Sequence, residues 1–90
     1  KIRIAKVFGI RISLDELEEK IKDIGYDVVC KNFNDKITIY YLKGQNIEKN
    51  LSKISNITGL SKLAFHFISL AEFPRTAVGK INHAKLNILN

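Results

Sequence analysis

The chain has 90 residues, enough for one small domain with a modest core. Hydrophobic residues make up 46% of it and charged residues 27%, the balance of a globular protein, which excludes a disordered tail. No apolar run approaches the ~20 residues that a membrane-spanning helix needs, and the formal net charge of +6 favours an anionic partner such as a nucleotide, a coenzyme or nucleic acid.

The chain contains no methionine and starts at Lys1 inside a strand-like run, so we expect a fragment of a longer protein. The N-terminus shows no signal-peptide pattern. The single cysteine, Cys30, cannot form an internal disulfide, and its strand-like surroundings predict a buried, reduced thiol. These features favour a cytoplasmic location.

The first dozen residues predict a two-stranded ribbon. Residues 1–7 alternate basic and apolar side chains, as a half-buried strand does, and residues 10–12 alternate again. Phe8-Gly9 separates the two runs, and Gly9 can take the positive φ that a tight turn requires.

A helix is predicted next. Ser13 and Glu16 have capping-box spacing, acidic residues crowd the first turns, and Gly25 is a natural stop. The apolar residues recur at steps of three and four, which places them on one helical face. They are Leu14, Leu17, Ile21 and Ile24.

A hairpin and a second helix follow. Residues 26–33 and 36–42 are rich in β-forming residues, and the two-residue link Asn34-Asp35 suits a hairpin turn. Asn46 is a candidate N-cap for a helix that Gly59 ends. The apolar stripe of this helix is Ile47, Leu51, Ile54 and Ile57.

The last predicted elements are a strand over residues 63–73 and a short helix. Pro74 should end the strand because proline cannot donate to a β-ladder, and Asn82 should cap the helix, with Leu86 and Leu89 on its buried side. The order predicts an α+β fold: an N-terminal two-stranded ribbon, then a small, mostly antiparallel three-stranded sheet flanked by two amphipathic helices, with a short C-terminal helix.

The loop after Pro74 is the strongest candidate for chemistry. Gly79 permits close approach of a ligand to the backbone, and Thr76 offers a hydroxyl to brace the turn. The ammonium of Lys80 suits a carboxylate, a phosphate, or charge that develops between them. The alternative is an exposed turn with an ordinary lysine. A Walker A loop is excluded, because Ile81 stands where that motif needs Ser or Thr.

The run Phe73-Pro74-Arg75-Thr76-Ala77-Val78-Gly79-Lys80-Ile81 resembles the last conserved motif of the adenylate-forming superfamily. This superfamily includes the AMP-forming acyl-CoA synthetases, the adenylation domains of peptide synthetases and the luciferases. The resemblance implies that Lys80 binds the substrate carboxylate and the ATP phosphate during adenylation. Residues 81–86 are similar to the family's continuation, and His83 stands where many members have a basic or aromatic residue.

Residues 5–18 resemble a second motif of the same superfamily, in which Lys-x-x-Gly-x-Arg-Ile precedes Glu-Ile-Glu close to the interdomain hinge. Lys6, Gly9, Arg11 and Glu18 occupy the matching positions. The resemblance implies that this ribbon swings into the active site for the second half-reaction, with Gly9 along the pantetheine channel. For Arg11 and Glu18, a structural ion pair at the helix start is the alternative to ligand contact.

Together the two motifs imply that residues 1–90 are the C-terminal lid domain of an AMP-forming ligase whose large N-terminal domain, its main partner, is absent. That enzyme would join a carboxylic acid to ATP, with Mg, and pass the acyl group to CoA or to the phosphopantetheine of a carrier protein. Alone, the 90 residues should be inactive. The hinge acid or lysine of the family falls near Ile2, so this element is either lost where the sequence starts or altered.

Other classes of function remain as alternatives. A basic, non-catalytic module that binds nucleic acid or an acidic partner would also explain the charge, and a degenerate ligase domain would explain the altered hinge. Aromatic residues beside lysines could stack RNA bases, although aromatics at strand spacing more often form a core. These residues are Tyr40, Tyr41, Phe65 and Phe67. His66 and His83 lack metal-ligand spacing, so no metal site is predicted.

Overall fold

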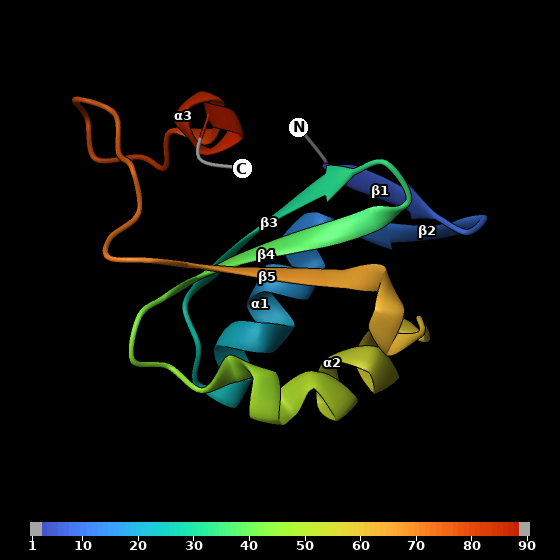
Figure 1. Ribbon diagram of the computed structural model, residues 1–90. Helices are drawn as coiled ribbons and strands as arrows, with labels where there is room; N and C mark the ends of the chain where they lie inside the picture. The colour runs from blue at the N-terminus through green and yellow to red at the C-terminus, as the bar shows by residue number, and fades with distance from the viewer. Residues whose placement is uncertain (1–2, 89–90) are drawn as a thin grey trace.

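The computed structural model describes residues 3–88 (Figure 1). Five strands, three α-helices and two 3₁₀ turns make up this part of the chain. In chain order they are β1 (Ile4–Val7), β2 (Ile10–Ser13), α1 (Leu14–Ile24), β3 (Val28–Phe33), β4 (Lys36–Leu42), the 3₁₀ turn η1 (Ile47–Asn50), α2 (Leu51–Thr58), the 3₁₀ turn η2 (Lys62–Ala64), β5 (Phe65–Leu70) and α3 (His83–Ile88).

The α+β prediction is confirmed. β1 and β2 form an antiparallel ribbon, and the second sheet has the strand order β3-β4-β5. β3 pairs with β4 antiparallel through a two-residue turn, whereas β5 joins β4 in parallel, so the three-stranded sheet is mixed. A parallel pair needs a crossover connection, and η1, α2 and η2 supply it. None of the helices within residues 3–88 is long and apolar enough to cross a bilayer.

Helix α1 forms as its sequence predicts. The Ser13 hydroxyl accepts a hydrogen bond from the Glu16 backbone N–H (3.3 Å), and Gly25 ends the helix with a left-handed φ of 116°. Leu14, Leu17 and Ile21 are buried on the face that packs against the sheet. The Tyr26 backbone N–H still bonds the Ile21 carbonyl (3.3 Å), so β3 begins at Val28, two residues later than predicted.

The second helix differs from the prediction at its start. Asn46 makes no side-chain capping bond, and the chain enters through the 3₁₀ turn η1 before α2 begins at Leu51. The predicted apolar stripe nevertheless packs on the main core, with Ile47 and Ile54 fully buried. Gly59 ends α2 with a left-handed φ of 74°, as expected.

The strand predicted over residues 63–73 is shorter in the structure. The Ser61 hydroxyl accepts a hydrogen bond from the Leu63 backbone N–H (3.2 Å) and starts the turn η2, which leaves Leu63 81% exposed. β5 therefore begins at Phe65. It ends at Leu70, before Pro74, so the prediction that Pro74 terminates the strand is wrong.

The C-terminal segment covers the other face of the sheet. Figure 1 shows α1 and α2 on one side of β3, β4 and β5 and α3 on the other. Asn82 caps α3 as predicted, since its side-chain oxygen accepts from the Lys85 backbone N–H (3.1 Å). The Tyr40 hydroxyl donates to the Leu86 carbonyl (3.2 Å), and Leu86 is fully buried against Tyr40 and Val29. The predicted position of Leu89 lies outside the described residues.

The strand aromatics belong to the core. Tyr40 is fully buried and Phe65 is 8% exposed, while Tyr41 and Phe67 pack edge to face with ring centroids 6.3 Å apart. A base-stacking role needs exposed rings, which Tyr40 and Phe65 do not offer, whereas Tyr41 and Phe67 are partly buried against the core. Cys30 is a free, fully buried thiol, as predicted, and burial raises its pKa.

The turn at the tip of the β1–β2 ribbon carries an unusual residue. Val7 pairs with Ile10, so Phe8-Gly9 forms the whole turn, and both residues have positive φ (50° and 80°). A type I′ turn of this kind strongly prefers Asn, Asp or Gly at both positions. Phe8 is 63% exposed and contributes no buried surface to the core.

Replacing Phe8 with asparagine should therefore stabilise the chain. The substitution Phe8→Asn removes a left-handed aromatic residue and supplies one that tolerates this conformation, a gain of about 1 kcal/mol in the free energy of unfolding. Urea denaturation measures it. Phe33→Asn, which removes a similarly exposed ring from a strand, is the control and should not stabilise. A Phe8→Asn chain no more stable than the unaltered one would contradict the strain assigned to this turn.

Candidate functional site

The Lys80 loop is a tight turn held by its own backbone. Arg75 and Ile81 form an isolated antiparallel bridge at its base. Inside the bridge, the Thr76 N–H donates to the Lys80 carbonyl (2.7 Å) and the Gly79 N–H donates to the Thr76 carbonyl (2.9 Å). The bracing expected from the Thr76 hydroxyl thus comes from the Thr76 backbone instead.

Two further contacts fix the loop. The Arg75 guanidinium donates to the Gly79 carbonyl (3.0 Å), and the Asn82 N–H donates to the Pro74 carbonyl (2.8 Å). Gly79 has φ 87°, a conformation that favours glycine. Lys80 follows directly and is exposed. The sequence therefore builds a rigid support for an ammonium group that faces solvent.

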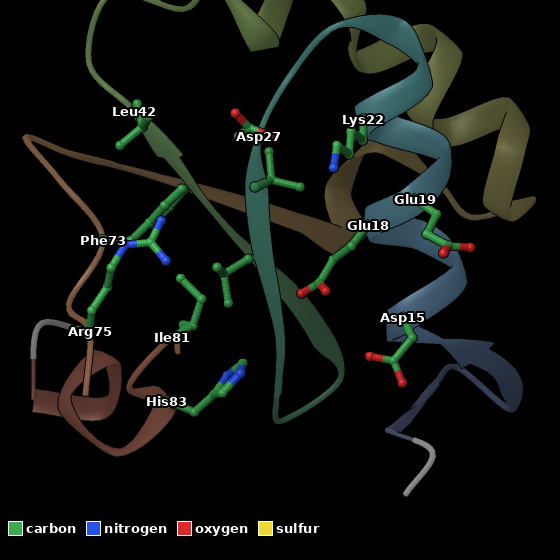
Figure 2. Close-up of a pocket in the computed structure, with 12 residues that line it drawn as sticks. Asp15, Glu18, Glu19, Lys22, Asp27, Leu42, Phe73, Arg75, Ile81 and His83 are labelled. Carbon is green, nitrogen blue, oxygen red and sulfur yellow. The ribbon is translucent and has the colours of Figure 1, made fainter. Parts of the chain in front are cut away.

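A groove of about 520 Å³ lies between α1 and the C-terminal segment (Figure 2). Asp15, Glu18 and Glu19 approach it from α1, and Arg75 and His83 face them from the other side. Partial burial, followed by the charge of Arg3, lowers the pKa of His83 below its usual 6.5, so the imidazole is neutral at pH 7. Lys80 does not line this groove, which therefore flanks the base of the loop rather than its tip.

The second predicted site lies on the β1–β2 ribbon. Gly9 sits in the exposed turn, and a Cβ built there would meet nothing within 4 Å. Lys6 and Arg11 are direct cross-strand partners, and both side chains are exposed. Like charges directly opposite each other destabilise a ribbon, so the arrangement suits an anion that neutralises them.

Glu18 forms its ion pair with Arg3 and not with Arg11. Its Oε1 lies 2.6 Å from Arg3 Nη2, and its Oε2 accepts from the Cys30 backbone N–H (2.7 Å). Arg3 also bonds Asp15 (2.7 Å) and donates to the Cys30 carbonyl (3.1 Å). Hydrogen bonds from the Arg3 side chain lower the pKa of Asp15. Glu18 thus stabilises the fold. Arg11, the partner expected for its ion pair, lies opposite Lys6 on the β1–β2 ribbon instead.

This Arg3 cluster escaped the sequence analysis because its members are far apart in the chain. Asp15 and Glu18 share one face of α1, three residues apart, which the helical pattern does show. Nothing in the strand-like alternation around Arg3 singles it out as their partner. The family's hinge position near Ile2 lies outside the described residues.

The two candidate sites lie at opposite ends of the molecule. Figure 1 shows the loop between β5 and α3 at the upper left and the tip of the β1–β2 ribbon at the far right, with the sheet between them. The chain does not bring Lys80 and Gly9 together. One ligand therefore cannot contact both at the same time. Within residues 3–88, no group of three or more acidic, His or Cys side chains could hold a metal ion.

Comparison with known proteins bears on the fold. No family model matches the chain, and no curated protein sequence matches it. Among solved structures, NpsA of Klebsiella oxytoca, determined in complex with 3-hydroxyanthranilyl-AMSN, is similar with a TM-score of 0.73 at 21% sequence identity. The match covers 97% of this chain and 20% of the NpsA chain. The chain thus has the fold of a segment that makes up a fifth of that protein.

Removing the Arg3 side chain should destabilise the fold. Arg3→Met leaves the Cys30 carbonyl and the Glu18 carboxylate without their charged donor, and we expect a loss of about 2 kcal/mol in the free energy of unfolding. Arg11→Met, which removes an exposed arginine without a partner among the described residues, should change stability by less than about 0.5 kcal/mol.

The loss of stability in Arg3→Met should also depend on pH. Arg3 lowers the folded-state pKa of Asp15 below its ordinary 3.8. The contribution of Asp15 to the free energy of unfolding is therefore complete above pH 3.8 and is lost as the pH falls through the folded-state pKa. The stability difference between the unaltered chain and Arg3→Met should therefore be smaller at about pH 3 than at pH 7. Equal differences at both pH values in urea denaturation would contradict this role of Asp15.

Proposed function

We propose that this chain is the C-terminal domain of an AMP-forming ligase that activates a carboxylic acid with ATP and transfers the acyl group to a thiol. The observation that supports this most directly is the placement of Lys80. A solvent-facing ammonium stands on a braced loop at one end of a fold that NpsA, solved with an adenylate analogue, also contains. Preorganised cations are the devices that stabilise charge developing between a carboxylate and a phosphate.

In the proposed first step, Lys80 neutralises charge between the substrate carboxylate and the α-phosphate of ATP, and pyrophosphate leaves. ATP with Mg would be held mainly by the large N-terminal domain that the resemblance implies. The loop is fixed by backbone bonds to Thr76 and by Arg75, so little movement of the backbone would be needed to present the ammonium where charge develops.

In the proposed second step, the acyl group passes from the adenylate to the thiol of CoA or of a carrier protein's phosphopantetheine. Gly9 would face this thiol, and Lys6 and Arg11 would neutralise anionic groups beside it. The separation of Lys80 and Gly9 across the molecule supports a rotation of the whole domain between the two steps (Figure 1). The 90 residues alone should form no acyl-adenylate.

Lys80→Ala in the complete enzyme tests the first step. Loss of the cation should slow adenylation by roughly 10²–10³-fold, the effect of removing one preorganised charge-stabilising donor. Thioester formation from added acyl-adenylate should be largely retained. Pyrophosphate release and thioester formation are measured separately, with Lys85→Ala, an exposed lysine of α3, as the control. If both half-reactions fall equally, or neither falls, Lys80 does not have this role.

Gly9→Leu tests the second step. A side chain at Gly9 meets nothing inside the domain, so it projects toward whatever faces the turn. We expect thioester formation to slow on the order of 10²-fold while adenylation is retained. Gly44→Leu is the matched control, because Gly44 also has positive φ (93°) and open space around it, and it therefore carries a similar backbone strain. An unchanged thioester step, or the same loss in both variants, would remove Gly9 from the mechanism.

A further inference from the structure

The two edges of the three-stranded sheet differ in how they are protected. β3 forms one edge, and there the backbone N–H and carbonyl of Cys30 are bonded by the side chains of Glu18 and Arg3. β5 forms the other edge (Figure 1). Charged side chains, prolines and bulges are common ways to keep an edge from pairing with another chain. β5 has none of them, since it pairs with β4 over all 6 of its residues without a bulge.

Two residues of β5 direct their backbone groups away from the sheet. The Leu70 carbonyl accepts from the Lys43 N–H (2.9 Å), so the backbone groups of Leu70 point toward β4. Backbone groups of successive residues in a strand point alternately to its two sides. The N–H and carbonyl of Phe67 and of Ser69 therefore point outward. We call these outward groups the β5 edge.

The side chains of β5 favour pairing with a further strand. The strand contains no Asp, Glu, Lys or Arg. Phe67 and Ile68 are of the aromatic and β-branched types that strands prefer, and His66 and Ser69 are exposed. Leu63, in the turn η2 that leads into β5, is 81% exposed. An uncharged, β-forming edge of this kind is a surface for strand addition.

The strand that fits this edge is β5 of a second copy of the chain. A two-fold axis brings the same strand of two copies together antiparallel, and each residue then meets a counterpart from the same sequence. With the axis at Ile68, Phe67 of each copy lies opposite Ser69 of the other. Both pairs are of the hydrogen-bonded kind, in which each residue donates its N–H to the carbonyl of the other. All the backbone groups of the β5 edge then have partners.

The neighbouring register is less complete. With the axis at Phe67, the Ser69 carbonyl would face the Phe65 N–H of the second copy. That N–H already donates to the Lys62 carbonyl within its own chain. The Ser69 carbonyl would then lack a partner at the interface, which costs free energy. The backbone thus favours the register centred on Ile68.

The space beside Ile68 is open to a second copy. Ile68 is half-buried and lines an open groove of about 630 Å³, here called the tip groove. Phe8, Phe33, Thr38 and His66 also line the tip groove. At the two-fold axis the two Ile68 residues form a non-hydrogen-bonded pair, the kind in which opposite side chains lie closest. Their contact adds apolar surface to the backbone bonds.

We propose that this chain forms a symmetric dimer in which the β5 edges of two copies pair antiparallel about Ile68. The two three-stranded sheets become one continuous sheet. The interface is narrow, so the dimer is weak and its population depends on concentration. The net charge of +6 on each copy opposes association, so sodium chloride should strengthen it. The dimer does not depend on the proposed function.

Analytical ultracentrifugation of the 90-residue chain tests the association. We expect the fraction of dimer to rise with protein concentration, up to about 1 mM, and with sodium chloride. Amide hydrogen exchange followed by NMR locates the contact, because the outward N–H groups of Phe67 and Ser69 should exchange more slowly as the dimer forms. A chain that stays monomeric at about 1 mM, or one that associates without protecting these two amides, would overturn the proposal.

Cysteine substitutions test the register. In the proposed dimer the Cα atoms of the two Ile68 residues lie about 4.5 Å apart, within the range of roughly 4.4–6.8 Å that a disulfide spans. Ile68→Cys should therefore form a covalent dimer with oxidised glutathione. His66→Cys is the control, since residue 66 is more exposed but lies opposite Leu70 of the second copy. Cys30 is fully buried in both variants. Equal or faster cross-linking of His66→Cys would contradict this register.

A proline at position 69 tests the backbone bonds. Ser69→Pro removes an outward N–H that takes no part in the ladder with β4, and edge strands tolerate such a proline. We expect the dissociation constant to rise by roughly 10-fold or more, because each copy loses one donor. Ser69→Ala keeps the N–H and should change it by less than about twofold. Circular dichroism checks that both variants fold, and dimerisation of folded Ser69→Pro as strong as that of Ser69→Ala would refute pairing through this edge.

Discussion

The Arg3 cluster is the contact on which the rest of the fold depends. β3 is an edge strand, and the backbone N–H and carbonyl of Cys30 are bonded by the side chains of Glu18 and Arg3. Unpaired edge groups invite pairing with other chains, and charged side chains are a common way to block them. The same two side chains tie β1 and α1 to that edge. The Arg3 cluster thereby fixes the ribbon, the first helix and the sheet relative to one another.

This fixation matters because the ribbon would otherwise be weakly held. β1 and β2 form a separate two-stranded sheet, and an isolated hairpin of this size is marginally stable in water. Ala5 and Val7 bury one face of it in the main core, and the backbone carbonyl of Arg3 accepts from the Leu14 N–H (2.9 Å). The strain at Phe8 is tolerable only because these contacts hold both strands in register.

The sequence predicts those parts of the fold that local rules decide. Helix α1 follows from Ser13, Gly25 and a clear apolar period, and the β3–β4 hairpin follows from its two-residue turn. Asn46 fails as a cap because the 3₁₀ turn η1 takes the first residues of that helix. Leu63 alternates correctly for a strand, yet the capping bond of Ser61 draws it into η2. The Arg3 cluster and the tip groove join residues distant in sequence, and no local pattern encodes them.

The two loops are fixed in different ways, and this difference bears on how the domain would work. The Lys80 loop is braced by an antiparallel bridge, internal backbone bonds and Arg75, so the backbone of Lys80 has a defined place relative to the sheet. The Phe8-Gly9 turn has two residues, against five between Arg75 and Ile81, but it is strained, and the Phe8 side chain is exposed. The ribbon packs on the main core, and the segment that carries the Lys80 loop packs on the second cluster, on the other face of the same sheet. Exchanging the two loops by internal flexing would have to break this packing, whereas a rotation of the whole chain would leave every one of these contacts intact.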